Sequence, residues 1–163
     1  MNMSSLKCAA LLAVPLLVHA DDAPNSVLLP AGTRVIVRAV EAVTPRKVKS
    51  GDKLPFVVHE DVVVNKQVVI KAESPSEVIV TDAQRSSSWS NRQGRLDFEI
   101  LAVEAVDGTR VELKNYKDYA QVGETPTWGH AYYSNPKIAS DQTFLAAVKS
   151  DITVRVIQAL EKK

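Results

Sequence analysis

Valine content is the feature that most constrains how this chain can fold. Valine occupies 24 of the 163 positions, and 22 of these valines lie after residue 20. Branching at Cβ restricts the side chain in a helix and favours extended backbone. Together with a hydrophobic fraction of 45%, this bias predicts a packed all-β domain and argues against a helical bundle or a disordered chain.

The order of residues inside the valine-rich segments supports the same fold. Residues 34–38 alternate polar and apolar side chains, which is the period of a half-buried strand. Asn65-Lys66 and Asp107-Gly108 are typical of hairpin tips, and Pro75 is expected at a strand start or a bulge because it has no N–H to donate. We therefore predict a single small antiparallel β-barrel or sandwich of seven to nine strands. The expected strands include segments 34–38, 56–58, 61–64, 67–70, 78–80, 96–105, 111–113 and 152–157.

Two segments depart from simple alternation. The apolar residues of 96–105 keep to one face as far as Ile100 and change phase from Leu101 onward, which predicts a β-bulge or a bend. Residues 140–149 allow one short helix, with Ser140 as its N-cap, and they allow a bent loop or a short strand nearly as well. Phe98 and Phe144 fall on apolar faces and are expected in the core.

Residues 1–20 have the features of an export signal. Lys7 precedes the apolar stretch 9–18, which is too short to span a bilayer, and Val18-His19-Ala20 fits a cleavage site. We expect cleavage after Ala20, a short linker over 21–27, and one β-domain over 28–163 without a membrane span. The only cysteine, Cys8, lies inside the signal, so the expected mature chain forms no disulfide. These features predict a bacterial protein that is periplasmic or secreted.

The order of turns and strands between residues 28 and 114 resembles small exported bacterial β-domains of uncharacterised function. It resembles more distantly the C-terminal β-barrel of the scaffold proteins of type IV secretion and conjugation channels. The resemblance lies in Leu29-Pro30-Ala31-Gly32-Thr33 and in the later valine strands. The family's Pro-Lys-Gly turn is replaced here by residues 71–75, which contain no glycine. The resemblance implies a barrel-like domain, and it does not extend to channel formation.

Composition and motifs exclude several classes of function. The chain has 20 basic and 19 acidic residues, a balance that argues against a nucleic-acid partner. One cysteine and three histidines leave little material for a metal centre, and no phosphate-binding or metalloprotease motif is present. We expect no cofactor, no metal and no enzymatic activity. The densest titratable cluster, His59-Glu60-Asp61, could serve acid–base or metal chemistry, but a polar bend facing solvent fits better because only two of the three side chains share a face.

Two loops are rich in residues suited to binding. Residues 86–94 form a polar run interrupted by Trp89, which is typical of a hairpin loop with an aromatic contact residue. Five of the nine aromatic residues fall within 115–137, where they form either a binding loop or a plug for one end of the barrel. The candidate binding residues are Trp89, Tyr116, Tyr119, Trp128, His130, Tyr132 and Tyr133.

These observations predict an exported non-catalytic binding or assembly module of the bacterial cell envelope. Its partner is expected to be an envelope protein or a glycan. The first alternative is a binder of peptidoglycan or polysaccharide, in which Trp128 and Tyr132 stack on sugar rings beside the amide of Asn135. A hydrolase that uses His59 or His130 is the least favoured alternative.

Overall fold

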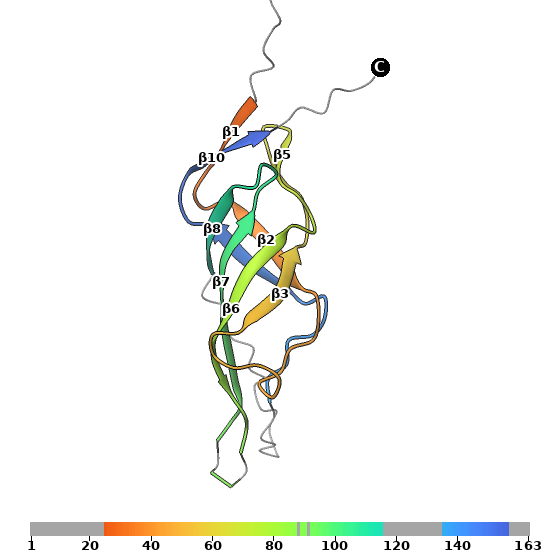
Figure 1. The fold of residues 1–163 in the computed structure, drawn as a ribbon, viewed down its shortest axis with the longest axis vertical. Helices are drawn as coiled ribbons and strands as arrows, with labels where there is room; N and C mark the ends of the chain where they lie inside the picture. The colour runs from red at the N-terminus through yellow and green to blue at the C-terminus, as the bar shows by residue number, and fades with distance from the viewer. Residues whose placement is uncertain (1–24, 88, 91, 116–134, 157–163) are drawn as a thin grey trace, which may run out of the picture.

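The computed structural model describes residues 25–87, 89–90, 92–115 and 135–156, and every regular element in these ranges is a β-strand (Figure 1). The all-β prediction is confirmed, with ten strands described where seven to nine were expected. None of the described residues belongs to a helix long and apolar enough to cross a membrane. The strands are β1 (Asn25–Leu29), β2 (Arg34–Ala39), β3 (Lys53–Val58), β4 (Val62–Val64), β5 (Gln67–Ile70), β6 (Pro75–Gln84), β7 (Arg95–Glu104), β8 (Arg110–Asn115), β9 (Thr143–Val148) and β10 (Ile152–Val156).

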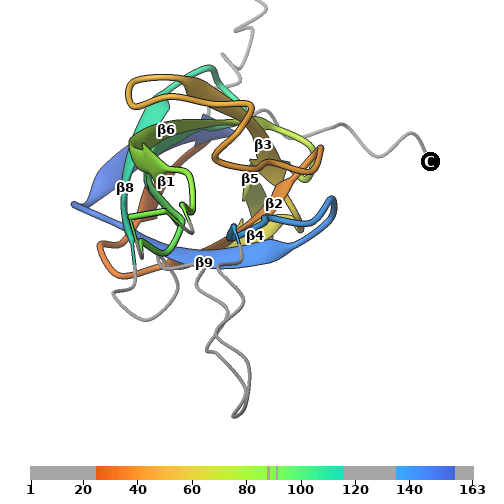
Figure 2. The same ribbon diagram turned by 90° about the horizontal axis from the view of Figure 1, so that it is seen from below.

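Six strands close into an antiparallel barrel in the order β2-β3-β6-β7-β8-β9, with β9 paired back to β2 (Figure 2). Closure pairs the outer strands of the sheet with each other, which removes the free edges an open sheet would expose. All three phenylalanines of the chain meet inside, Phe56 from β3, Phe98 from β7 and Phe144 from β9. Their ring centroids lie 4.9–5.7 Å apart. The prediction that Phe98 and Phe144 belong to the core is confirmed.

Two small sheets, β1–β10 and β4–β5, lie at one end of the barrel (Figure 1). Leu29, Ile70 and Val154 from these sheets are fully buried and belong to the same hydrophobic cluster as the barrel interior. Asn65 and Lys66 form the β4–β5 turn with positive φ angles of 50° and 64°, as expected for a two-residue hairpin tip. Because β1 begins at Asn25, residues 25–27 belong to a strand and not to the linker expected over 21–27.

The helix considered near residues 140–149 does not form, and the strand alternative is correct. Residues 143–148 are β9, in which Phe144, Ala146 and Val148 are buried. This strand pairs with β2 on one side and with β8 on the other, so it closes the barrel. Backbone pairing on both edges outweighs the local helix-start signal at Ser140. The residue after it, Asp141, instead adopts a φ of 62° in the turn before the strand.

The β6–β7 hairpin is the longest among the described residues and carries two register shifts. Ile100 pairs with Val78 and Ala102 with Glu77, so Leu101 is the extra residue of a bulge. The predicted bulge is thus confirmed, but the buried face changes after Ala102 and not after Ile100, because Ala102 and Val103 are both buried and Leu101 is half-buried. A second shift leaves Thr81 as the extra residue on β6. Bulges bend a hairpin, and this one extends past the barrel at the end opposite β1 and β10 (Figure 1).

Candidate functional site

The tip of the β6–β7 hairpin presents the most exposed large hydrophobic side chain among the described residues. Ser87 and Arg92 close the tip through two backbone hydrogen bonds of 2.9 and 3.0 Å. The backbone N–H of Ser90 also donates to Ser87 Oγ at 3.4 Å. Trp89 lies between them with 99% of its surface exposed. An indole buries a large apolar area when it packs, and none of that burial is realised here within the described part of the chain.

The base of the hairpin is tied to two segments that are distant in sequence. The N–H of Ser86 donates to Asn135 Oδ1 at 2.8 Å, and Arg85 Nη2 donates to the carbonyl of Arg46 at 3.2 Å. Gly94 packs so closely that a Cβ there would lie 2.8 Å from Asn135 Oδ1. Asn135, assigned to the glycan hypothesis from its sequence context, therefore holds the hairpin in place. These contacts set the direction in which the tip projects.

The three segments joined at this point carry only one sign of charge. Residues 43–50, 85–94 and 135–137 contain six basic side chains and no acidic one. All six are exposed, and within the described residues none of them takes part in an ion pair. We call this surface the basic end; its members are Arg46, Lys47, Lys49, Arg85, Arg92 and Lys137.

The charge of the basic end is offset elsewhere in the molecule. The described residues contain 16 basic and 14 acidic side chains, so ten basic and 14 acidic side chains remain outside the basic end. A near-zero net charge therefore conceals a strongly uneven distribution. The total charge of the chain does not indicate this surface; the local signal in the sequence is Arg46-Lys47 beside Lys49.

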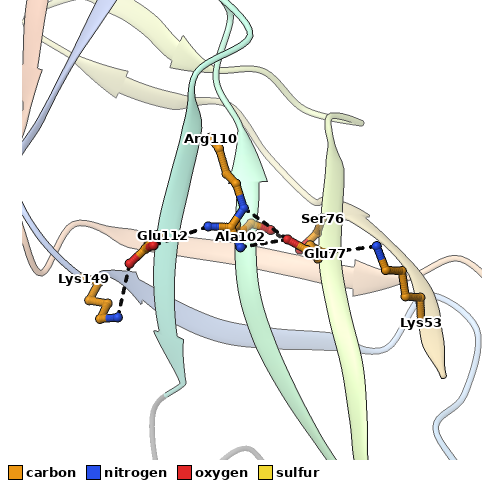
Figure 3. A network of polar contacts seen from close by, with 7 residues as sticks. All are labelled: Lys53, Ser76, Glu77, Ala102, Arg110, Glu112 and Lys149. Atoms are coloured by element: carbon orange, nitrogen blue, oxygen red, sulfur yellow. Dashed lines mark hydrogen bonds and ion pairs between the residues drawn. The ribbon is translucent and has the colours of Figure 1, made fainter. Parts of the chain in front are cut away.

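The outer wall of the barrel carries a second polar feature, a row of charges that alternate in sign (Figure 3). Glu77 pairs with Lys53 at 3.5 Å and with Arg110 at 2.8 Å. Glu112 continues the row, 3.4 Å from Arg110 and 3.2 Å from Lys149. The hydrogen bond between Arg110 and Glu77 lowers the pKa of the carboxyl and raises the pKa of the guanidinium. Each charge in the row already has a partner within the row, so its ion pairs connect strands of the barrel wall to one another.

A hollow of about 410 Å³ lies beside this row, between β3, β6, β7 and β8. Ser76, the only buried polar residue among those described, lines it. Its hydroxyl donates to the carbonyl of Ala102 at 3.3 Å, next to the bulge at Leu101. No histidine lines the hollow. The hydroxyl is thus committed to a backbone acceptor at an irregular point of the sheet, where the bulge disturbs the regular pairing.

A second hollow, of about 500 Å³, lies where β7 and β8 separate. The two strands pair only at residues 102–104 and 110–112. Farther along, the side chain of Asn115 replaces the missing backbone pairing. Its Nδ2 donates to the carbonyl of Phe98 at 3.2 Å, and its Oδ1 accepts from the N–H of Ile100 at 2.9 Å. Asn115 therefore keeps the lower part of β8 joined to β7.

The structure places the titratable cluster His59-Glu60-Asp61 in an exposed bend between β3 and β4. Asp61 Oδ1 accepts a hydrogen bond from the N–H of Ala72 at 2.6 Å, which is a turn-stabilising contact. The interpretation of this cluster as a solvent-facing polar bend is confirmed. Within the described ranges, no group of three or more His, Cys, Asp or Glu side chains is placed to hold a metal ion.

Of the predicted binding residues, only Trp89 falls within the described part of the chain. The six others lie outside it, so the choice between a binding loop and a barrel plug stays a prediction. They are Tyr116, Tyr119, Trp128, His130, Tyr132 and Tyr133.

Comparisons of the chain with protein-family models, with curated proteins and with solved structures found no match.

Proposed function

We propose that the protein is an exported, non-catalytic binding module of the bacterial cell envelope, and that it binds its partner with the tip of the β6–β7 hairpin. The observation that carries this proposal is the complete exposure of Trp89 at the end of a projecting, anchored hairpin. Tryptophan is enriched among the residues that dominate binding interfaces. A ring held away from the barrel contributes little to folding, so a role in contact explains its position.

Two further features support the proposal. Residues 1–20 combine a positive charge, a short apolar stretch and a cleavage-site pattern, as expected for export. Among the described residues, three polar side chains that chemistry could use are committed elsewhere: the Ser76 hydroxyl to a carbonyl, Asp61 to a backbone N–H, and Glu77 to Arg110. A rigid barrel that presents one exposed loop is a common arrangement for recognition.

The experiment measures how strongly washed envelope material from the producing bacterium retains the unaltered protein and two variants. Trp89→Ala is tested beside Val63→Ala, because Val63 is also an exposed hydrophobic residue (55%) but lies on β4 at the opposite end. We expect Trp89→Ala to weaken capture by about 30-fold or more, the effect of losing a hot-spot aromatic, and Val63→Ala to leave capture unchanged. Both variants should melt at the temperature of the unaltered protein. Equal capture of the two variants would contradict the proposal.

An envelope glycan is the second candidate partner. A fully exposed indole offers a flat apolar face, and such faces stack on sugar rings. Sedimentation with purified peptidoglycan, free of membrane, separates this candidate from a protein or lipid partner. Retention that depends on Trp89 would favour the glycan.

A further inference from the structure

We infer that the basic end docks on an anionic lipid bilayer, with the Trp89 ring at the level of the headgroups and the six basic side chains facing them. This inference rests on the proposed function, because it names the partner of the same hairpin tip. Three properties of the described residues support it: the sign and number of the charges, the shape of the tip, and the connection between them.

The charge of the basic end matches an anionic surface. Six exposed cations lie on three adjacent segments that contain no acidic residue. One carboxylate, that of Asp52, contacts these segments, where it accepts a hydrogen bond from the backbone N–H of Lys49 at 2.7 Å. Of the ten described basic side chains outside the basic end, five are paired with carboxylates, namely Arg38, Lys53, Arg95, Arg110 and Lys149, whereas none of the six in the basic end is paired within the described residues. A cation without an internal partner is free to interact with external anions, and a negatively charged leaflet attracts each such residue within about a Debye length of its surface.

The shape of the tip suits a bilayer better than a polymer chain. Trp89 projects from the convex end of a two-stranded hairpin, and neither hollow described above is lined by a residue of 85–94. A glycan or a nucleic-acid strand is generally held in a groove or across several stacking rings. A bilayer, in contrast, accepts a projecting ring, and tryptophan is enriched at the membrane–water interface. The neighbouring Ser87, Ser90 and Arg92 stay among the hydrated headgroups.

The ring and the charges are held at the same end of the molecule. The hydrogen bonds from Ser86 to Asn135 and from Arg85 to Arg46 join the hairpin to the segments that carry Lys137, Lys47 and Lys49. A membrane that receives the tip therefore also meets the cations at the base. The remaining described surface carries four more acidic than basic side chains, which favours an orientation with the basic end toward an anionic membrane.

The experiment measures co-sedimentation of the protein with vesicles of phosphatidylcholine alone or with added phosphatidylglycerol. We expect binding only where phosphatidylglycerol is present, with a steep loss as salt is raised. Replacing Arg46, Lys47 and Arg92 together by Gln should weaken vesicle binding by about 100-fold, because the loss of each charge weakens it by about fivefold. The matched control neutralises Lys66, Lys71 and Arg155, exposed cations outside the basic end, and should bind within about twofold of the unaltered protein.

Tryptophan fluorescence reports the position of the ring. The measurement uses a Trp128→Phe variant, in which Trp89 is the only tryptophan. Anionic vesicles should shift its emission to shorter wavelength, and unshifted emission of vesicle-bound protein would overturn the placement of the ring. Equal weakening by the two triple variants would overturn the inference. Binding to soluble polyphosphate or an anionic polysaccharide without vesicle binding would also overturn it, in favour of a polymer ligand.

Envelope capture distinguishes failure of this inference from failure of the proposed function. Capture that depends on Trp89, without any vesicle binding, would overturn the lipid partner and leave the binding role of the tip standing. If Trp89→Ala keeps both envelope capture and vesicle binding at the level of the unaltered protein, the lipid inference and the proposed binding role of the tip are both overturned.

Discussion

Replacing Asn115 tests how the barrel stays closed where β7 and β8 separate. The Asn115 amide donates to the Phe98 carbonyl at 3.2 Å and accepts from the Ile100 N–H at 2.9 Å. Asn115→Ala removes both bonds and leaves two backbone groups without partners. An unsatisfied buried group costs about 1–3 kcal/mol, and the partial burial of Asn115 places each near the lower bound. We expect a loss of about 2 kcal/mol in the free energy of unfolding.

The assay is urea unfolding followed by circular dichroism, with a thermal melt in parallel. A loss of about 2 kcal/mol should lower the Tm by roughly 4–8 °C for a domain of this size. Lys114→Ala is the matched control, because it changes the adjacent residue of the same strand, whose side chain is exposed. The control should change the free energy of unfolding by less than about 0.5 kcal/mol.

Asn115→Asp separates the two hydrogen bonds. The carboxylate still accepts from Ile100 but cannot donate to the Phe98 carbonyl, and it repels that oxygen. Protonation restores the donor, so the pKa of the introduced carboxyl should be raised in the folded state. A raised pKa stabilises the fold below the unfolded-state value and loses that stabilisation as pH rises through the folded-state value. Stability equal to that of the unaltered protein in both Asn115 variants would refute the bridging role.

Three further predictions concern the core, the hairpin base and one turn. Phe98→Ala should cost about 3–5 kcal/mol in urea unfolding, because it opens a cavity among the three packed rings; a cost under 1 kcal/mol would contradict the described core. Gly94→Ala should break the contact between Asn135 and the hairpin, since the new Cβ would lie 2.8 Å from Oδ1, and hydrogen exchange at Ser86 should accelerate while the barrel amides stay protected. Burial raises the pKa of Asp107, but hydrogen bonds from backbone N–H groups, that of Arg155 first, lower it by more. This stabilisation is present above the ordinary carboxyl pKa and is lost as pH falls through the lower folded-state value. Between about pH 5 and pH 2, the Tm of Asp107→Asn should therefore fall less than that of the unaltered protein. An equal fall in the two proteins would contradict this role of Asp107.

Strand positions were predictable from sequence because alternation and turn chemistry act locally. Leu96, Phe98 and Ile100 identify the inward face of β7, and the phase change after them locates the bulge within one residue. The prediction was weakest at β9, where Ser140 and the residues after it satisfied a helix-start pattern as well as a strand. Pairing with β2 and β8 decided that segment, and such pairing joins residues about 30 to 110 positions apart.

The candidate site was predictable only in part. Trp89 could be recognised because a lone aromatic in a polar run is a local signal. The basic end could not be read from the net charge, because Arg46, Arg85 and Lys137 are far apart in sequence. Likewise, nothing in the surroundings of Asn115 or Asn135 indicated that their amides would bridge separate segments. Each of these contacts exists only once distant parts of the chain are brought together.

The sequence by itself determined that this chain forms β-strands, which face of most strands is buried, and where the hairpins turn. These properties depend on the shape of single side chains and on the order of near neighbours. The tertiary structure alone decided that six strands close into a barrel, that β9 is one of them, and that three separate segments bring their cations to the hairpin that carries Trp89. Barrel closure and the local surface charge both depend on residues that are distant in sequence. Neither property exists until the chain is folded.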